Sequence, residues 1–224
     1  MLSILNRLSP QIRKADFDKE AKMFLEKFCP EALLTPMAVP IIDIARKKMG
    51  LRIVERHLSE DLSVLGQMCF TNGIAVIYDK ENDEFREVKA RYGTMIIDPD
   101  TVKKRNEGCM NNTVAHECFH WHKHRDYHIS VSVKENVKGV KRYCYSDKKP
   151  ESTQKDWTDE DWMEWQANGV ALRILLPCDM FKIMAEKTLD EYDYRWAVNN
   201  LASFFKVSKQ AVKIRLEETG YSLY

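Results

Sequence analysis

The stretch His116-Glu117-Cys118-Phe119-His120 carries two histidines four positions apart, near the middle of a 224-residue chain. On a helix this spacing places both imidazoles on one face, one turn apart, where they can reach a single cation. Glu117 follows the first histidine directly, so its carboxylate can take a proton from a water molecule at that cation. The stretch therefore predicts a helix with two metal ligands and a general base.

Two other histidine pairs have the same spacing, namely His120 with His124 and His124 with His128. Neither pair has a glutamate directly after its first histidine. Only the pair His116 and His120 therefore supplies ligands and base together. Histidine pairs on helix surfaces are common, so the motif needs support from the rest of the chain.

Upstream of the motif, the pattern predicts two helices and then a small sheet. An apolar face with helical spacing indicates a helix over residues 15–29. A second helix is expected over 36–50, capped by Thr35, or starting only at Pro40 because proline disturbs a helix interior. Short apolar stretches between turn signals predict the strands, at 51–58, 66–70, 74–78 and 94–97.

Downstream elements are predominantly helical. Asn111 or Asn112 is expected to cap the motif helix, which would run to about residue 125. Residues 126–157 read as a long excursion with strand-like pieces at 129–133 and 142–145, and long excursions are often functional.

A further helix follows the excursion. Thr158 and Asp161 resemble a capping box, and Pro177 should stop this helix after residue 176. Three more helices are expected at 178–188, 191–206 and 208–219, with Ser208 as a cap and Gly220 as a terminator.

These elements predict a single α+β domain over residues 1–224. A small, mostly antiparallel sheet should pack against the motif helix, and the C-terminal region should be helical. The expected parts are helices and sheet (15–110), the motif helix (111–125), the excursion (126–157), the next helix (158–176) and a helical tail (178–220).

Composition narrows the functional class. Lys and Arg total 35 and Asp and Glu total 34, so a globally basic nucleic-acid binder is not expected. No apolar run approaches the length of a membrane span, and the first residues lack a signal-peptide pattern, so we expect a cytoplasmic protein without membrane contact. The six cysteines are scattered, which favours reduced and mostly buried thiols.

A catalytic zinc has three protein ligands and one open position, so a third ligand is required. Downstream residues supply several candidates, which are His122, His124, His128, Asp159, Glu160, Asp161 and Glu164. Asp161 is more naturally a helix cap, and Glu160 a surface residue. His122, His124, Tyr127, His128 and Tyr145 are also candidates for a transition-state donor.

Two linked motifs resemble the ImmA/IrrE family of metallopeptidases. The first is Thr113-Val114-Ala115-His116-Glu117-x-x-His120. The second is Glu164-x-x-Ala167-Asn168-x-x-Ala171-x-x-x-Leu175-Leu176-Pro177. A helical-tail pattern, Leu201-Ala202-x-x-Phe205-x-Val207-Ser208-x-x-Ala211-Val212-x-x-Arg215, extends the similarity, which covers residues 30–220.

The resemblance implies a zincin-like fold with Glu164 as the third metal ligand beside His116 and His120, and Glu117 as the catalytic base. Asn168, one turn beyond Glu164, could orient a ligand. Zinc is the expected metal, although Mn²⁺ or Fe²⁺ suits the same ligands. The family commonly has an aliphatic residue at Cys118, a small residue at Phe119 and an aromatic residue at Val170, so these positions are expected to alter the pocket.

The resemblance also implies a protein substrate, namely a repressor-type transcription regulator. We expect its strand to add to an exposed sheet edge, with residues 93–97 as the candidate. The alternative function is a DNA-binding regulator that uses a helix-turn-helix-like segment at 197–219, but the balanced charge disfavours it. A binder that holds metal without cutting is a third possibility, and Glu117 argues against it because a structural site needs no base.

Overall fold

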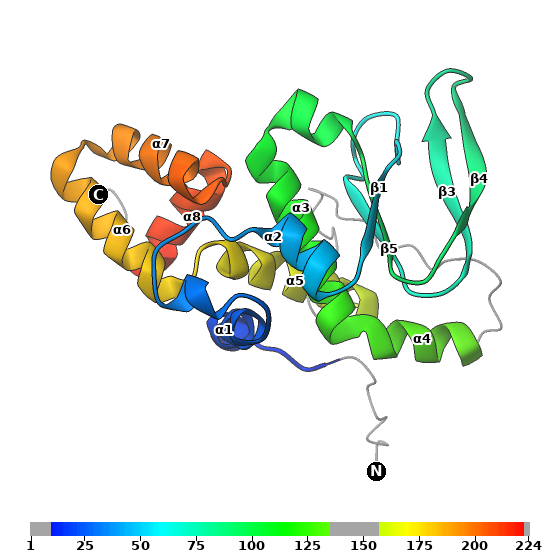
Figure 1. Ribbon diagram of the computed structural model, residues 1–224, viewed down its shortest axis with the longest axis horizontal. Coiled ribbons are helices and arrows are strands. Elements are labelled where there is room, and N and C mark those ends of the chain that lie inside the picture. The colour runs from blue at the N-terminus through cyan, green and yellow to red at the C-terminus, as the bar shows by residue number, and fades with distance from the viewer. Residues whose placement is uncertain (1–9, 135–156, 222–224) are drawn as a thin grey trace, which may run out of the picture.

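The computed structural model describes residues 10–134 and 157–221. Figure 1 shows strands at one side, the long helices in the middle and a group of helices at the other side. The helices are α1 (Phe17–Phe28), α2 (Ile41–Asp43), α3 (Glu107–Phe119), α4 (Arg125–Lys134), α5 (Asp159–Leu175), α6 (Cys178–Glu191), α7 (Tyr194–Phe205) and α8 (Lys209–Thr219). Short 3-10 or π segments are η1 (Lys14–Asp16), η2 (Pro30–Leu33), η3 (Ile44–Lys48), η4 (Thr101–Arg105) and η5 (His120–His124).

The strands form two small sheets. The strands are β1 (Arg52–Glu55), β2 (Gly66–Cys69), β3 (Gly73–Asp79), β4 (Glu84–Ala90) and β5 (Thr94–Ile97). β5 is central in the first sheet, with β1 parallel on one side and β2 antiparallel on the other. β3 and β4 form an antiparallel hairpin. Because β5 is flanked on both sides, the prediction that residues 93–97 form an exposed edge is wrong.

The first sheet is covered on both faces. Met68 and Met95 belong to the main core, together with Val114 and Cys118 of α3. The neighbouring residues Cys69 and Ile96 point to the opposite face and pack with the β3–β4 hairpin in a second cluster. This alternation is what strand geometry requires of a strand buried on both faces. The predicted α+β class is confirmed, and the sheet that packs against the motif helix has one parallel and one antiparallel pairing.

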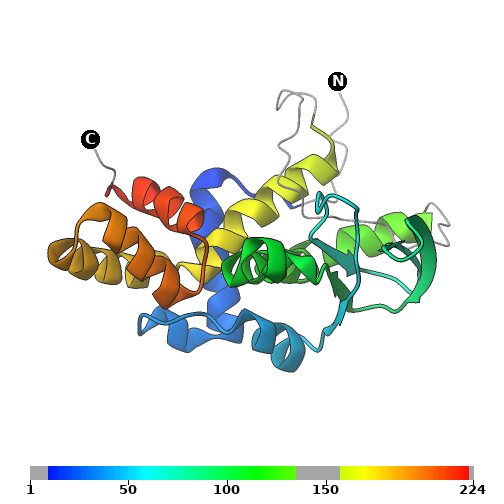
Figure 2. The ribbon, with the colours of Figure 1, turned by 90° about the horizontal axis from the view of Figure 1, so that it is seen from above.

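The central helices lie against one another. α3 contacts α5, and α1 contacts α5 in turn. Figure 2 shows α1 crossing the region of α5. Gly169 of α5 allows this contact, because an added Cβ would lie 1.9 Å from the Phe17 ring. Arg215 of α8 is buried, donates to the Leu176 carbonyl and forms an ion pair with Asp18 of α1, so the C-terminal helices are tied to the N-terminal one.

Several local predictions are confirmed. Thr158 and Asp161 form a capping box at the start of α5. Ser208 caps α8, accepting from the Ala211 amide at 3.1 Å. Gly220 ends that helix with a φ of 91°. Each of these signals acts within a few residues, where side-chain chemistry decides the backbone conformation.

The motif helix differs from the prediction at both ends. It begins at Glu107 with Asn106 as its cap, whereas Asn111 lies inside the helix and donates to the Lys206 carbonyl. Glycine has a low helix propensity, so Gly108 gives no indication in the sequence that the helix begins before it. At the other end, the helical path continues through η5 into α4, and Figure 1 shows the chain changing direction between α3 and α4. A π segment is a recognised cause of such a bend.

Three further predictions need correction. Residues 129–133 are helical, within α4, and are not a strand. Of the two starts considered for the second helix, the one at Pro40 is confirmed, because the helix starts at Ile41 directly after Pro40; residues 36–40 are not helical and Thr35 is not its cap. β4 was not predicted, since most of its side chains are charged and exposed. The strand-like piece expected at 142–145 lies outside the described residues.

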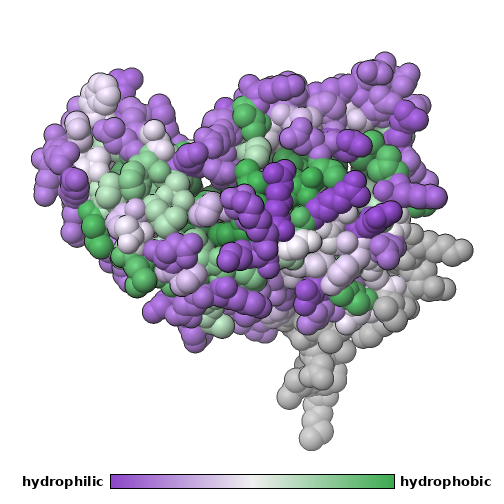
Figure 3. Space-filling model, viewed as in Figure 1, coloured by the Kyte–Doolittle hydropathy of each residue, from purple (hydrophilic) through white to green (hydrophobic). Residues whose placement is uncertain are grey.

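In the described part of the chain, no helix combines the length and apolarity needed to cross a bilayer. Figure 3 shows hydrophilic side chains spread over the face in view. Apolar patches lie between them, and the surface is hollowed between the α6–α8 part and the part that holds α3 and the sheet. The buried residues that pack around α3 form the main core of the molecule.

The close approach of α3 to the turn before α8 generates a prediction. An added Cβ at Gly108 would lie 2.2 Å from the Val207 carbonyl carbon and 2.4 Å from the Ser208 nitrogen. Both atoms are backbone, so they cannot rotate away. We expect Gly108→Ala to lower the free energy of unfolding by about 1–3 kcal/mol in urea titrations, although alanine in an open helix would raise it by about 1 kcal/mol.

Glu107→Ala is the matched control for that substitution. Glu107 is the neighbouring residue, and its exposed carboxylate lies 3.3 Å from the Lys206 ammonium. Exposed pairs contribute little, so the control should change the unfolding free energy by less than about 1 kcal/mol. A Gly108→Ala variant as stable as the wild type would show that α3 and the turn are not in contact.

Candidate metal centre

Three side chains direct their ligand atoms to one point. The Nε2 atoms of His116 and His120 are 3.0 Å apart. Each lies 3.2 Å from one carboxylate oxygen of Glu164. Zinc with donors about 2.0–2.2 Å away in tetrahedral geometry holds those donors about 3.3 Å apart. The spacing and the chemistry of this donor set therefore fit a divalent transition-metal ion.

The two histidines come from one helical path and the glutamate from another. His116 lies in the last turn of α3, and His120 begins η5 directly after it. α5 packs beside α3 and brings Glu164 to both rings. The histidine side chains are completely buried and that of Glu164 is 25% exposed. The arrangement leaves Glu164 as the side of the centre nearest to solvent.

The electrostatics favour the protonation states that a metal requires. Burial lowers the pKa of His120 below its ordinary value, although the nearby Glu164 carboxylate acts in the opposite direction. Burial alone would raise the pKa of Glu164, but the imidazoles of His120 and His116 hold it well below the usual range. Neutral imidazole and ionised carboxylate are the metal-binding forms.

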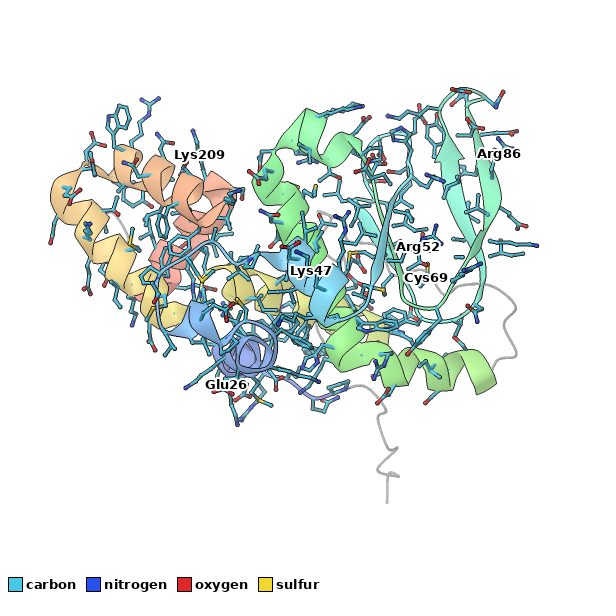
Figure 4. The ribbon with its side chains drawn as sticks, in the orientation of Figure 1. Glu26, Lys47, Arg52, Cys69, Arg86 and Lys209 are labelled. Carbon is cyan, nitrogen blue, oxygen red and sulfur yellow. The ribbon has the colours of Figure 1, made fainter. Side chains whose placement is uncertain are left out.

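Glu117 is buried beside this group and is accommodated by a glycine. An added Cβ at Gly66 of β2 would lie 3.1 Å from a Glu117 carboxylate oxygen and 2.6 Å from the Thr113 methyl carbon. The carboxylate also influences Cys69, labelled in Figure 4: burial and then the charge of Glu117 raise the pKa of this thiol to about 12. The strand therefore approaches α3 closely at the position of the expected base.

A chain of polar contacts extends from the far side of His120. Its Nδ1 lies 3.0 Å from Nδ1 of His124. Nε2 of His124 lies 3.1 Å from Oε1 of Gln166, whose side-chain amide donates to the Pro10 carbonyl at 2.9 Å. Burial, followed by the neighbouring His120, lowers the pKa of His124 well below its ordinary value. The sequence reading missed Gln166, for which no spacing signal exists.

Two other candidate histidines lie further along the same helical path, His122 in η5 and His128 in α4. His122 packs edge-on against the rings of Phe24 and Phe28. His128 is buried with its ring centroid 4.3 Å from that of Phe70. His122 therefore packs among aromatic side chains, whereas the ring of His128 also lies near the centre, with its centroid 6.2 Å from that of His120.

Three acidic candidates begin α5. Asp161 has a capping role, because its carboxylate accepts from the amide of the N-cap residue Thr158, while Asp159 and Glu160 also lie in the first turn. Asn168 is exposed, and in the described part of the chain it forms no hydrogen bond with His116, His120 or Glu164. The orienting role expected of Asn168 stays a prediction, while Gln166, two residues before it, contacts His124. Tyr145 lies outside the described residues.

A second acidic group, His57 with Asp98 and Asp100, has ligand-like spacing. Lys80 and Lys104 already form ion pairs with Asp100. The hydrogen bond from Lys80 lowers the pKa of Asp100 to about 2, although burial acts in the opposite direction. Asp98 accepts from the backbone amides of Leu58 and Asp100. These carboxylates are neutralised by lysines and backbone donors, so the group stabilises the loops after β1 and β5.

Comparison with known proteins identifies the family. The sequence profile of the IrrE N-terminal-like domain, a peptidase family, matches residues 104–217, which is half of the chain. The chain belongs to this family. Membership of a metallopeptidase family implies a metal ion, and the match spans the His116–His120 motif as well as α5.

Other comparisons add little to this result. No curated protein matches the chain. Among solved structures, a Mycobacterium tuberculosis transcriptional regulator is similar at 15% identity with a TM-score of 0.47. The similarity covers 91% of this chain, which spans only 46% of that regulator's chain.

Residues that depart from the family pattern prove to be core residues. Cys118, Phe119 and Val170 are all fully buried. The Phe119 ring meets His124 edge-on, with centroids 5.3 Å apart. Burial raises the pKa of the Cys118 thiol, followed by the Glu117 charge. These residues therefore belong to the core, and the expectation that they alter the pocket stays a prediction.

The helix-turn-helix-like segment of this IrrE-like chain is docked on α3. The turn between α7 and α8 touches Gly108, and Asn111 donates to the Lys206 carbonyl at 2.9 Å. Lys209 is exposed on this part, away from Cys69 and the sheet in Figure 4. A recognition helix enters the groove by its first turns. Here the residues just before α8 already pack against the core.

The tight contact at Gly66 generates the next prediction. Gly66→Ala would force the Thr113 methyl and the Glu117 carboxylate to move, and we expect a loss of about 1–3 kcal/mol in unfolding free energy. Thr113→Ser removes the methyl carbon that lies 2.6 Å from the added Cβ and keeps the hydroxyl that donates to the Cys109 carbonyl.

The double variant Gly66→Ala with Thr113→Ser tests the cause of that loss. We expect it to be more stable than the Gly66→Ala variant, because the closest overlap is removed. Urea unfolding of the four proteins measures the coupling between the two positions. Strictly additive changes would contradict direct contact between these side chains.

Proposed function

We propose that this chain is a zinc-dependent peptidase in which His116, His120 and Glu164 hold the metal and Glu117 is the general base. The observation that carries the proposal is that three side chains bring their donor atoms within 3.0–3.2 Å of one another, with a buried carboxylate one residue after the first histidine. A structural zinc site is usually closed by four protein ligands, whereas three ligands leave a position for reaction.

His116, His120 and Glu164 would hold a divalent cation, which when bound would polarise the peptide carbonyl and lower the pKa of water. Glu117 then accepts the proton of the attacking water and passes it to the leaving amine. Its burial between α3 and Gly66 strengthens this role, because a carboxylate with little competing solvent interacts more strongly with a proton donor. Zinc is the proposed metal, while Mn²⁺ and Fe²⁺ would suit the same two imidazoles and one carboxylate.

The proposed substrate is a repressor-type transcription regulator, which the ImmA/IrrE resemblance favours. We further propose that residues 1–224 act as one peptidase domain, since Arg215 and Asp18 join the last helix to the first. A cytoplasmic location is part of the proposal, because the five described cysteines are free thiols and a reducing compartment keeps thiols in that form.

β2 replaces β5 as the proposed strand for substrate addition. In the described sheet β2 has a neighbour on one side only, and its first residue, Gly66, lies against Glu117. An extended peptide paired with β2 would bring its backbone close to the proposed base. The alternative function, DNA binding through α7 and α8, is less well supported because the turn between them packs on α3.

Substitution of the base should separate chemistry from metal binding. We expect Glu117→Gln to retain about one metal ion per chain while cleavage of a repressor substrate falls by roughly 10²–10⁴-fold. Glu164→Ala should lose both metal and activity, because it removes one of three ligands. Elemental analysis measures the metal, and gel analysis of the substrate measures cleavage.

Asp161→Ala serves as the matched control for Glu164→Ala. It removes a carboxylate from the same helix, where Asp161 caps the first turn and has no contact with the three ligand candidates. It should cost stability by about 1 kcal/mol and leave the metal in place. Absence of stoichiometric divalent metal from both the wild type and Glu117→Gln would refute the peptidase proposal.

The DNA-binding alternative has its own test. Lys209→Ala with Lys213→Ala removes two exposed cations from α8 and should leave repressor cleavage unchanged. If the chain binds duplex DNA through α8, the same double variant would weaken that binding and reduce its salt dependence. Electrophoretic mobility shifts at two salt concentrations distinguish the two functions.

A further inference from the structure

The contacts behind His120 form a continuous path from the proposed metal centre to the N-terminal segment. They join residues that are far apart in sequence: His120 and His124 from η5, Gln166 from α5 and Pro10 before η1. The imidazoles are completely buried and Gln166 is 2% exposed. Polar groups at such depth are expensive unless each has a partner, so the path satisfies groups that solvent cannot reach.

The hydrogen bond between Gln166 and the Pro10 carbonyl determines which atom is the donor in each of the other contacts of the path. The Gln166 amide nitrogen donates to the Pro10 carbonyl, which leaves its oxygen facing His124 Nε2. That oxygen can only accept, so His124 carries its hydrogen on Nε2 and presents a lone pair at Nδ1. His120 must then donate from Nδ1, so its Nε2 carries the lone pair that points toward His116 and Glu164, where a cation would bind.

We propose that His124 is a positioning residue, held by Gln166 and the Pro10 carbonyl, that fixes the orientation and tautomer of His120 for metal binding. This inference rests on the proposed metal centre and assigns to three residues a role beyond the ligands themselves. Hydrogen bonds to the second nitrogen of a ligand histidine orient its ring and raise its basicity.

The geometry excludes His124 as a ligand of the same centre. Its Nδ1 contacts the Nδ1 of His120, which is on the opposite side of that ring from the Nε2 that meets His116 and Glu164. Packing holds this orientation, because the Phe119 ring stands edge-on to His124 with centroids 5.3 Å apart. The two ends of the His120 ring thus serve different partners.

The path also explains why the N-terminal segment matters to the centre. Pro10 has no amide hydrogen, so its carbonyl is its only polar backbone group and is free to accept from Gln166. The carbonyl lies 156 positions from Gln166 in sequence. Metal affinity should therefore depend on a contact at the start of the chain as well as on the two ligand helices.

The test compares metal binding of full-length variants. His124→Phe keeps a ring of similar size without hydrogen-bonding atoms, and Gln166→Met keeps the side-chain length without the amide. His122→Phe is the matched control, because it makes the same substitution two residues away, where the ring faces Phe24 and Phe28. Competition with a chromophoric chelator gives the Zn²⁺ affinity, and the visible spectrum of the Co²⁺ form reports the ligand field.

We expect His124→Phe and Gln166→Met each to weaken Zn²⁺ binding by about 10–100-fold and to alter the Co²⁺ spectrum. The double variant should bind Zn²⁺ with an affinity within about threefold of the single variant that binds it less tightly, because the two substitutions interrupt the same path. His122→Phe should keep the wild-type affinity and spectrum. If His124→Phe does not fold, Gln166→Met alone carries the comparison.

The outcomes separate this inference from the proposed function. A wild type that binds Zn²⁺ with unchanged affinity and spectrum in His124→Phe and Gln166→Met overturns the positioning role and leaves the peptidase proposal intact. Losses that add fully in the double variant also overturn it, since they would arise independently. A wild type that binds no Zn²⁺ overturns both.

Discussion

The contact between α3 and α5 is the constraint on which the rest of the structure depends. It buries two imidazoles and brings the Glu164 carboxylate within 3.2 Å of each. Burying such groups without partners would cost several kcal/mol, so the helices can pack here only if the polar atoms satisfy one another or a metal. The surrounding core, from Val114 to Leu175, fixes the helix separation that makes these contacts possible. The contact between α3 and α5 thus both packs the core and provides partners for the buried polar atoms.

Small residues mark the places where this interface is approached from outside. Gly66 admits β2 to α3, Gly108 admits the turn before α8, and Gly169 admits the Phe17 ring to α5. At each position a methyl group would overlap a neighbour at 1.9–2.6 Å. Interiors are packed as tightly as organic crystals, so such overlaps cannot be absorbed. The glycines therefore set how closely β2 and the turn before α8 approach the motif helix, and how closely α1 approaches α5.

The parts of the fold that the sequence predicted are those decided locally. The spacing of His116 and His120, the Thr158–Asp161 capping box and the Ser208 cap depend on residues within one or two helical turns. The start of α3 was missed because Gly108 is retained for a contact with Val207, ninety-nine positions away, against its helix propensity. β4 lacked an apolar pattern, since its pairing with β3 in an exposed hairpin does not require one. Gln166 carried no signal at all, because its role exists only after α5 has packed on η5.

The buried path through His124 and Gln166 restricts which side chains can occupy the core next to the proposed metal ligands. Phe119 and Cys118 stand where relatives carry other side chains, yet both are fully enclosed and Phe119 supports the His124 ring. A larger or smaller side chain in place of Phe119 would move His124, and that movement would break the contact of His124 with Gln166, which is itself held by the Pro10 carbonyl. The departures from the family pattern are therefore constrained by hydrogen bonds as much as by volume. Substitutions in this part of the core would therefore affect the geometry of the proposed metal centre through the imidazole of His124.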